Sequence, residues 1–242
     1  MAGVKTGISG QINNNIVTDG FIFYVDPAYK KSWTGPNSTN VTDLIGTSNG
    51  TIYNDTSDSY GINNSFAFDG TDDYIDLGTE ILFNSTKSFS VFAWVKLTGY
   101  SPSIYPAILK LKTDTSTGWL MSLSNAAAYA GVVFGSSSNF VRGRTTGDIS
   151  GDFIGTWKHV CLTFDGIDKT DLSSYKIYVD SNNISLVSAG SFSTVSNTSS
   201  TIGAAQGNRF NGDIGPIKVY NKTLSASEVL QNYQAQKERF GF

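Results

Sequence analysis

The sequence is poor in the residues that build metal centres, disulfide frameworks and phosphate-binding surfaces. Its 242 residues include one cysteine, Cys161, and one histidine, His159. A single cysteine cannot close a disulfide within the chain, and a zinc site needs several histidine or cysteine ligands. Only 15% of the residues are charged, the net charge is −3, and there is no basic tract. Because nucleic-acid binding depends on clustered Lys and Arg, we expect no nucleic-acid partner.

Long apolar stretches are also missing. The first residues, MAGVKTGISGQINNN, lack the apolar segment of a secretion signal. No run approaches the roughly 20 apolar residues that a membrane-spanning helix needs. We therefore expect a protein made in a cytoplasm, without a signal peptide and without insertion into a membrane.

Short alternating strands fill most of the chain. In KSFSVFAWVKL (residues 87–97), four apolar side chains share one face, while Phe92 and Trp94 lie on the other, so both faces should be partly covered. Cys161 follows the same alternation and is expected to be a buried thiol. Many short strands separated by turn residues predict an all-β antiparallel jelly-roll sandwich. The expected strands cover residues 20–26, 51–54, 65–70, 74–77, 87–97, 107–112, 118–124, 129–135, 139–144, 156–166, 174–183, 184–187, 200–204 and 210–220.

One short helix is predicted near the C-terminus, over residues 225–237. Ser225 is a good N-cap, Glu228 completes a capping box, and Leu224 and Val229 are spaced to form a hydrophobic staple. The apolar stripe of this helix should pack on the edge of the sandwich or contact another subunit. We divide the chain into a polar arm at residues 1–18 and one domain at residues 19–242.

Six segments in order carry a family resemblance: FIFYVDP, SFAFDGTDDYIDLG, FSVFAWVK, WKHVCLTFDG, YKIYVDSN and FNGDIGPIKVYNKTLSASEV. Together they resemble a laminin-G-like, concanavalin A-like jelly roll over about residues 20–240. The beginning GFIFYVDPAYKKSW and the ending LSASEVLQNYQAQKERFG resemble versions found in virion proteins of tailed bacteriophages. That resemblance implies a capsid decoration, head fibre or tail-associated protein located in the virion. Its arm or C-terminal tail would contact other virion proteins, and it would form a homo-oligomer.

A carbohydrate site would combine exposed aromatic rings with a few polar groups and little charge. The candidates for such a site are Trp33, Trp119, Tyr129, Arg142 and Arg144. The expected ligand is a host-surface glycan, bound weakly by each of many copies.

Calcium is the cofactor that the resemblance implies. Related jelly rolls hold this ion between the first strand, an early turn and the last strand, and the matching positions here are Asp26, Asp72 and Asp213. Oxygen-rich turns suit a calcium ion. The sequence departs from the family pattern at Gly215, where the family usually has an aspartate.

No set of catalytic residues is evident in the sequence. Glycosidases with this jelly roll carry Glu-x-Asp-x-Glu on one strand, and that string is missing here. His159 is expected to be a packed structural imidazole. We therefore predict a non-enzymatic phage virion protein that displays a carbohydrate-binding jelly roll. The alternatives are a cement protein without glycan affinity and a polysaccharide-degrading enzyme.

Overall fold

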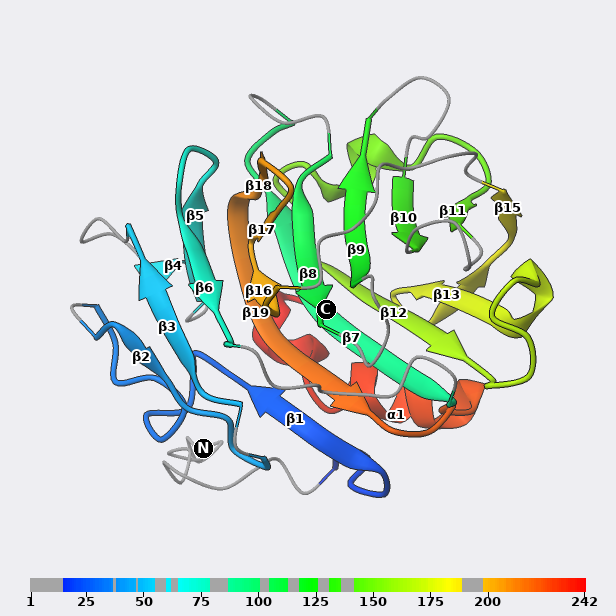
Figure 1. Cartoon of the computed structure of the whole chain (residues 1–242), viewed down its shortest axis with the longest axis horizontal. Coiled ribbons are helices and arrows are strands. Elements are labelled where there is room, and N and C mark those ends of the chain that lie inside the picture. Colours follow the sequence, from blue (N-terminus) through cyan, green and yellow to red (C-terminus); the bar gives the residue numbers. More distant parts are fainter. Residues whose placement is uncertain are drawn as a thin grey trace, which may run out of the picture.

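The computed structural model describes residues 15–36, 38–46, 48–54, 60–61, 65–78, 87–100, 105–112, 118–125, 131–135, 142–188 and 198–242. For residues 60, 61 and 142 the description covers the backbone. Within these ranges the chain forms two stacked antiparallel sheets and one α-helix, which confirms the predicted all-β sandwich (Figure 1). No helix in the described ranges is long and apolar enough to cross a membrane.

The first sheet has eight strands in the described residues and runs in the order β14-β13-β12-β7-β19-β5-β4, with β1 also beside β19. Every pairing in it is antiparallel. Its strands are β1 (Phe21–Val25), β4 (Tyr60–Gly61), β5 (Ser65–Asp69), β7 (Phe89–Leu97), β12 (Lys158–Phe164), β13 (Tyr175–Val179), β14 (Asn182–Ile184) and β19 (Asn211–Tyr220).

The second sheet has nine strands in the described residues and runs in the order β15-β11-β10-β9-β8-β16-β6-β3-β2. Its strands are β2 (Asn40–Val41), β3 (Gly50–Tyr53), β6 (Tyr74–Asp76), β8 (Ala107–Leu111), β9 (Trp119–Ser124), β10 (Gly131–Gly135), β11 (Arg142–Thr145), β15 (Leu186–Ser188) and β16 (Thr201–Ile202). A small hairpin, β17 (Ala204–Ala205) with β18 (Asn208–Arg209), packs over its outer face, where Ala205 contacts Ala107 and Leu120.

The hydrophobic core lies between the sheets and is built by the alternation that the sequence predicts. Phe89, Val91 and Val95 of β7 point inward and join one large cluster of buried side chains. Phe92 and Trp94 are also fully buried, although they point away from that cluster. Both faces of β7 are therefore covered, as predicted.

Helix α1 (Ala226–Gln234) covers Phe92. Ser225 and Glu228 form the predicted capping box. Val229 packs against Phe92 and Cys161, so the helix lies on the outer face of the eight-stranded sheet rather than on the sandwich edge, which corrects the prediction. The α-helix also ends three residues earlier than predicted, and a 3-10 turn, η3 (Lys237–Phe240), follows it. The other 3-10 turns are η1 (Ser150–Phe153) and η2 (Leu172–Ser174).

The turn η3 explains the glycine that breaks the family pattern. The ring of Phe240 stacks on Trp94 with centroids 4.2 Å apart. A Cβ atom at Gly215 would approach the Phe240 ring to 3.0 Å and Trp94 Cβ to 3.1 Å. A side chain at this position would therefore press on the Phe240 ring, which would have to shift by a few tenths of an ångström.

His159 and Cys161 are structural, as predicted. His159 is fully buried, and its ring lies 5.1 Å from that of Trp94 and 5.4 Å from that of Phe92. Burial, with a smaller contribution from the charge of Lys218, holds the pKa of His159 well below its usual value. Burial raises the pKa of the Cys161 thiol well above its usual value. Neither side chain is accessible to a substrate.

The end of the predicted arm binds the C-terminal helix. The Val17 amide donates a hydrogen bond to Asn232 (3.0 Å), and the Tyr220 hydroxyl donates one to the Val17 carbonyl (2.9 Å). Residues 1–14 of the predicted arm lie outside the described residues.

Candidate functional site

Two of the predicted aromatic platforms are core residues. Trp33 is 1% exposed, packs against Phe66, and donates its indole N–H to the Ser38 carbonyl. Trp119 is 3% exposed and packs against Phe89 and other rings between the sheets. The prediction that they contact a ligand is therefore wrong: Trp119 points inward by the alternation of β9, and Trp33, in the connection between β1 and β2, packs into the same core cluster.

The other three candidates are placed only in part. Tyr129 and the side chain of Arg142 lie outside the described residues. Arg144 is half-buried and donates a hydrogen bond to the Thr145 carbonyl (3.1 Å). It pairs with Val133, a neighbour of the core residues Val132 and Phe134, so it lies on the outer face of the nine-stranded sheet.

The three predicted calcium ligands have separate partners. Asp26 is buried and accepts hydrogen bonds from Arg239 (2.6 Å), the Tyr24 hydroxyl (2.8 Å) and the amide of residue 28 (2.9 Å). Asp213 pairs with Lys96 (2.9 Å) and accepts a hydrogen bond from residue 65 (2.8 Å). The structure does not bring these two carboxylates together with Asp72.

Asp72 instead belongs to an acidic cluster with Asp69 and Asp73. One carboxylate oxygen of each lies within 4.8 Å of the others. Such clusters are common on protein surfaces without an ion, so calcium stays a prediction here.

An aromatic column stands on the outer face of the nine-stranded sheet. Tyr53 of β3 and Tyr74 of β6 are cross-strand partners whose rings stack with centroids 4.9 Å apart and planes 8° from parallel. The guanidinium of Arg209, from the β17–β18 hairpin, lies 5.3 Å from the centroid of the Tyr74 ring. Tyr53 is 43% exposed. The column therefore presents a flat apolar ring beside polar groups.

A row of polar side chains runs across the same face next to the column. In the strand register, each residue of the row pairs with the next. The residues beside them in each strand point into the core, so the row faces outward. The row consists of Asn40, Thr51, Asp76, Thr201 and Lys110.

Lys110 ends this row in an unusual environment. Its side chain is 6% exposed, and its ammonium group has no hydrogen bond or ion pair with any residue that the structure describes. Burial lowers the pKa of Lys110, and the carboxylate of Asp76 opposes this shift. The Lys110 ammonium is not among the fully enclosed polar atoms, so it is open to a ligand that brings an oxygen acceptor.

The column and the row together suit a polyhydroxylated ligand. A saccharide has a C–H face that can lie on Tyr53 and hydroxyl groups that can exchange hydrogen bonds with Thr51 and Asp76. Lys110 lies two strands further along the row. None of these residues is among the candidates that the sequence offered. The alternation in Thr51-Ile52-Tyr53 and Tyr74-Ile75-Asp76 does place both tyrosines on the polar face.

Comparisons with known proteins agree with the architecture. A family model described as the concanavalin A-like lectin/glucanases superfamily matches residues 69–230. No curated protein matches the sequence.

Solved structures with a similar fold include a Trypanosoma rangeli sialidase in complex with sialic acid, at a TM-score of 0.62 and 16% identity. That match covers 94% of this chain and 35% of the sialidase. The binding domain of botulinum neurotoxin serotype D is also similar, at a TM-score of 0.59 and 15% identity, covering 90% of this chain and 52% of that one. The chain thus spans between about a third and a half of these proteins, and the likeness shows the fold.

These likenesses correct the predicted function. The solved structures with a similar fold include sialidases and neurotoxin binding domains, and they contradict the prediction of a non-enzymatic bacteriophage structural protein. The prediction of no catalysis is contradicted as well, because sialidases are glycosidases. At this identity the likeness identifies no active-site residue in the chain. The predicted location and protein partners stay predictions.

Proposed function

Because the chain belongs to the concanavalin A-like lectin/glucanases superfamily, we propose that it is a glycan-binding domain. The saccharide lies on the outer face of the nine-stranded sheet. The observation that carries this proposal is the exposed ring of Tyr53 standing beside the polar row that ends at Lys110.

Each part of this face has a role in the proposed complex. Tyr53 supports one sugar ring, and stacking on Tyr74, whose ring in turn lies against Arg209, holds the Tyr53 ring in place. Thr51 and Asp76 exchange hydrogen bonds with hydroxyl groups, because they offer a donor and acceptors at neighbouring positions of the row.

Lys110 favours a saccharide that carries an acidic group. Its ammonium supplies three donors and one positive charge, and a carboxylate is the acceptor that would stabilise it most. Sialic acid, which is bound in one of the similar sialidase structures, is a sugar of this acidic class. Acidic saccharides therefore belong in the first binding screen beside neutral ones.

The test is binding of the full chain to an array of neutral and acidic saccharides, followed by calorimetry on those that bind. Tyr53→Ala should weaken binding of every bound saccharide about tenfold. Lys110→Met should weaken acidic saccharides by about tenfold or more and leave neutral ones less affected. Phe242→Ala is the matched control, because Phe242 is also 43% exposed and packs against Trp94 on the other sheet. An array without any bound saccharide, or variants that bind like the parent protein, would refute the proposal.

A further inference from the structure

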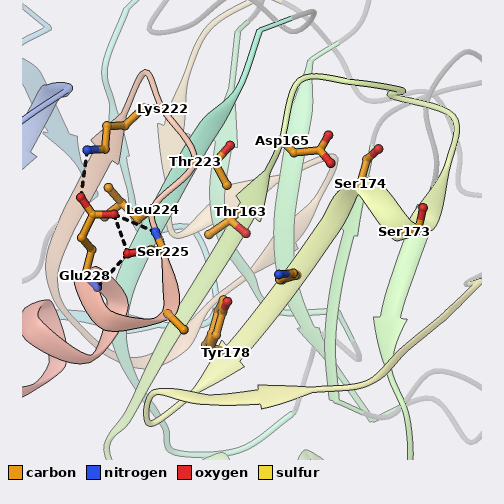
Figure 2. Close-up of a pocket in the computed structure, with 12 residues that line it drawn as sticks. Thr163, Asp165, Ser173, Ser174, Tyr178, Lys222, Thr223, Leu224, Ser225 and Glu228 are labelled. Carbon is orange, nitrogen blue, oxygen red and sulfur yellow. Dashed lines mark hydrogen bonds and ion pairs between the residues drawn. The ribbon is translucent and has the colours of Figure 1, made fainter.

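A pocket of about 310 Å³ opens on the outer face of the eight-stranded sheet (Figure 2). The aromatic column stands on the outer face of the other sheet. One wall is the outer face of β12 and β13, and the other is the connection between β19 and α1. The two walls are distant in sequence, so only the folded chain forms this pocket.

Two nearly buried side chains present their hydroxyl groups to the pocket. Thr163 of β12 and Tyr178 of β13 are 1% and 3% exposed and both line it. The register pairs Thr163 with Lys176 and Cys161 with Tyr178, so all four side chains share the outer face of the sheet. Neither the Thr163 nor the Tyr178 hydroxyl has a hydrogen-bond partner in the described part of the chain.

The lack of a hydrogen-bond partner for these two hydroxyl groups is informative, because polar groups of nearly buried side chains are normally hydrogen-bonded. Neither hydroxyl oxygen is among the fully enclosed atoms that lack a partner, so each stays accessible from the pocket. Both groups can donate and accept a hydrogen bond. They are therefore available to a ligand at no cost in protein–protein hydrogen bonds.

The opposite wall is held in place before any ligand binds. The Ser90 hydroxyl, which is buried, donates to the Lys222 carbonyl (2.8 Å) and accepts from the Leu224 amide (2.9 Å). The Thr223 hydroxyl donates to the Phe164 carbonyl (2.7 Å), which ties the connection to β12. A wall fixed in this way loses little conformational entropy on binding.

The charges around the pocket balance. Its lining residues include two carboxylates, Asp165 and Glu228, and two ammonium groups, Lys176 and Lys222. Lys222 pairs with Glu228 (2.9 Å), and also with Asp19 outside the pocket (2.6 Å). A ligand with a net charge gains little here, whereas one with several hydroxyl groups can meet both donors and acceptors.

We propose that this pocket is a second ligand site, which takes a neutral polyhydroxylated molecule such as the terminal hexose of a glycan or a cyclic polyol. Thr163 and Tyr178 bind its hydroxyl groups from below, and Asp165 and Lys176 bind it at the rim. The site is separate from the sheet face that carries Tyr53, so either site can exist without the other.

The test uses the full chain and four neutral probes: the methyl α-glycosides of glucose, galactose and mannose, and myo-inositol. Binding is followed by calorimetry and by chemical-shift changes of the backbone amides. We expect at least one probe to bind and to shift the amides of β12, β13 and residues 222–226. Thr163→Val and Tyr178→Phe, which keep the side-chain shapes, should each weaken that probe about tenfold. Both variants should unfold within about 2 °C of the parent protein, since each removes a hydroxyl without a protein partner.

Two controls separate this site from the other one and from a structural role. Tyr53→Ala should leave probe binding at the pocket unchanged, and Tyr233→Phe, which removes a phenol on α1 outside the pocket, should do the same. The proposal is overturned if no probe binds, if both pocket variants bind like the parent protein, or if both unfold much earlier.

Discussion

The ion pair between Arg239 and Asp26 offers the sharpest test of how the C-terminal segment is held. Arg239 lies in η3, and its guanidinium donates a hydrogen bond to the carboxylate of Asp26, the residue that follows β1. The two atoms are 2.6 Å apart. The Asp26 side chain is 1% exposed and the Arg239 side chain 21%. Replacing Arg239 by methionine removes the charge but keeps most of the aliphatic stem, so the carboxylate is left buried without its cation.

The expected loss in unfolding free energy is about 3 kcal/mol. Removing one partner of a buried pair costs roughly 3 to 5 kcal/mol, because the remaining charge is uncompensated. The lower value applies because Asp26 keeps the hydrogen bonds from the Tyr24 hydroxyl (2.8 Å) and the Ala28 amide (2.9 Å). For a chain of this length, the melting temperature should fall by roughly 6 to 12 °C.

The assay is urea unfolding followed by tryptophan fluorescence, because Phe240 stacks on Trp94 in the same segment. The double variant Asp26→Asn with Arg239→Met should be more stable than Arg239→Met alone, since it removes the buried charge. Asp19→Asn, at a surface pair whose aspartate is 83% exposed, should leave the unfolding free energy unchanged. A loss below about 1 kcal/mol for Arg239→Met, with an unchanged m-value, would refute the reasoning.

Three further perturbations test separate features. Ser225→Ala should lower the unfolding free energy by about 1 kcal/mol in the same urea assay, because it removes the N-cap of α1. Burial lowers the pKa of Lys218 to about 7, so from about pH 7 to pH 9 the unfolded chain binds more protons than the folded one. Stability should therefore rise with pH by on the order of 1 kcal/mol per unit, and Lys218→Met should flatten that rise in urea titrations at each pH. Gly212→Ala should sharply reduce the melting temperature, since Gly212 has φ +142° and a Cβ would collide with the Lys96 carbonyl oxygen. An unchanged melting temperature would show that the β19 backbone can move there.

The positions of the side chains in the candidate sites could not be predicted from the sequence. Trp33 and Trp119 were expected at the surface because an isolated tryptophan in a loop or short strand does not reveal which side it faces. Tyr53 and Tyr74 form a platform only because β3 and β6 pair in one register. Thr163 and Leu224 meet at one pocket because β12 and the β19–α1 connection lie side by side in the fold.

Features that depend on residues close together in the chain could be predicted from the sequence. Strict alternation predicted which side chains lie on each face of β7. The spacing of Ser225 and Glu228 predicted the capping box and the start of α1. The six segments, in their order along the chain, were sufficient to identify the jelly roll by resemblance to a known family. Tertiary structure decided that α1 covers the outer face of the eight-stranded sheet, that Arg239 reaches Asp26, and which polar groups remain without a partner. These outcomes depend on contacts between residues far apart in the chain, and strand periodicity carries no information about such contacts.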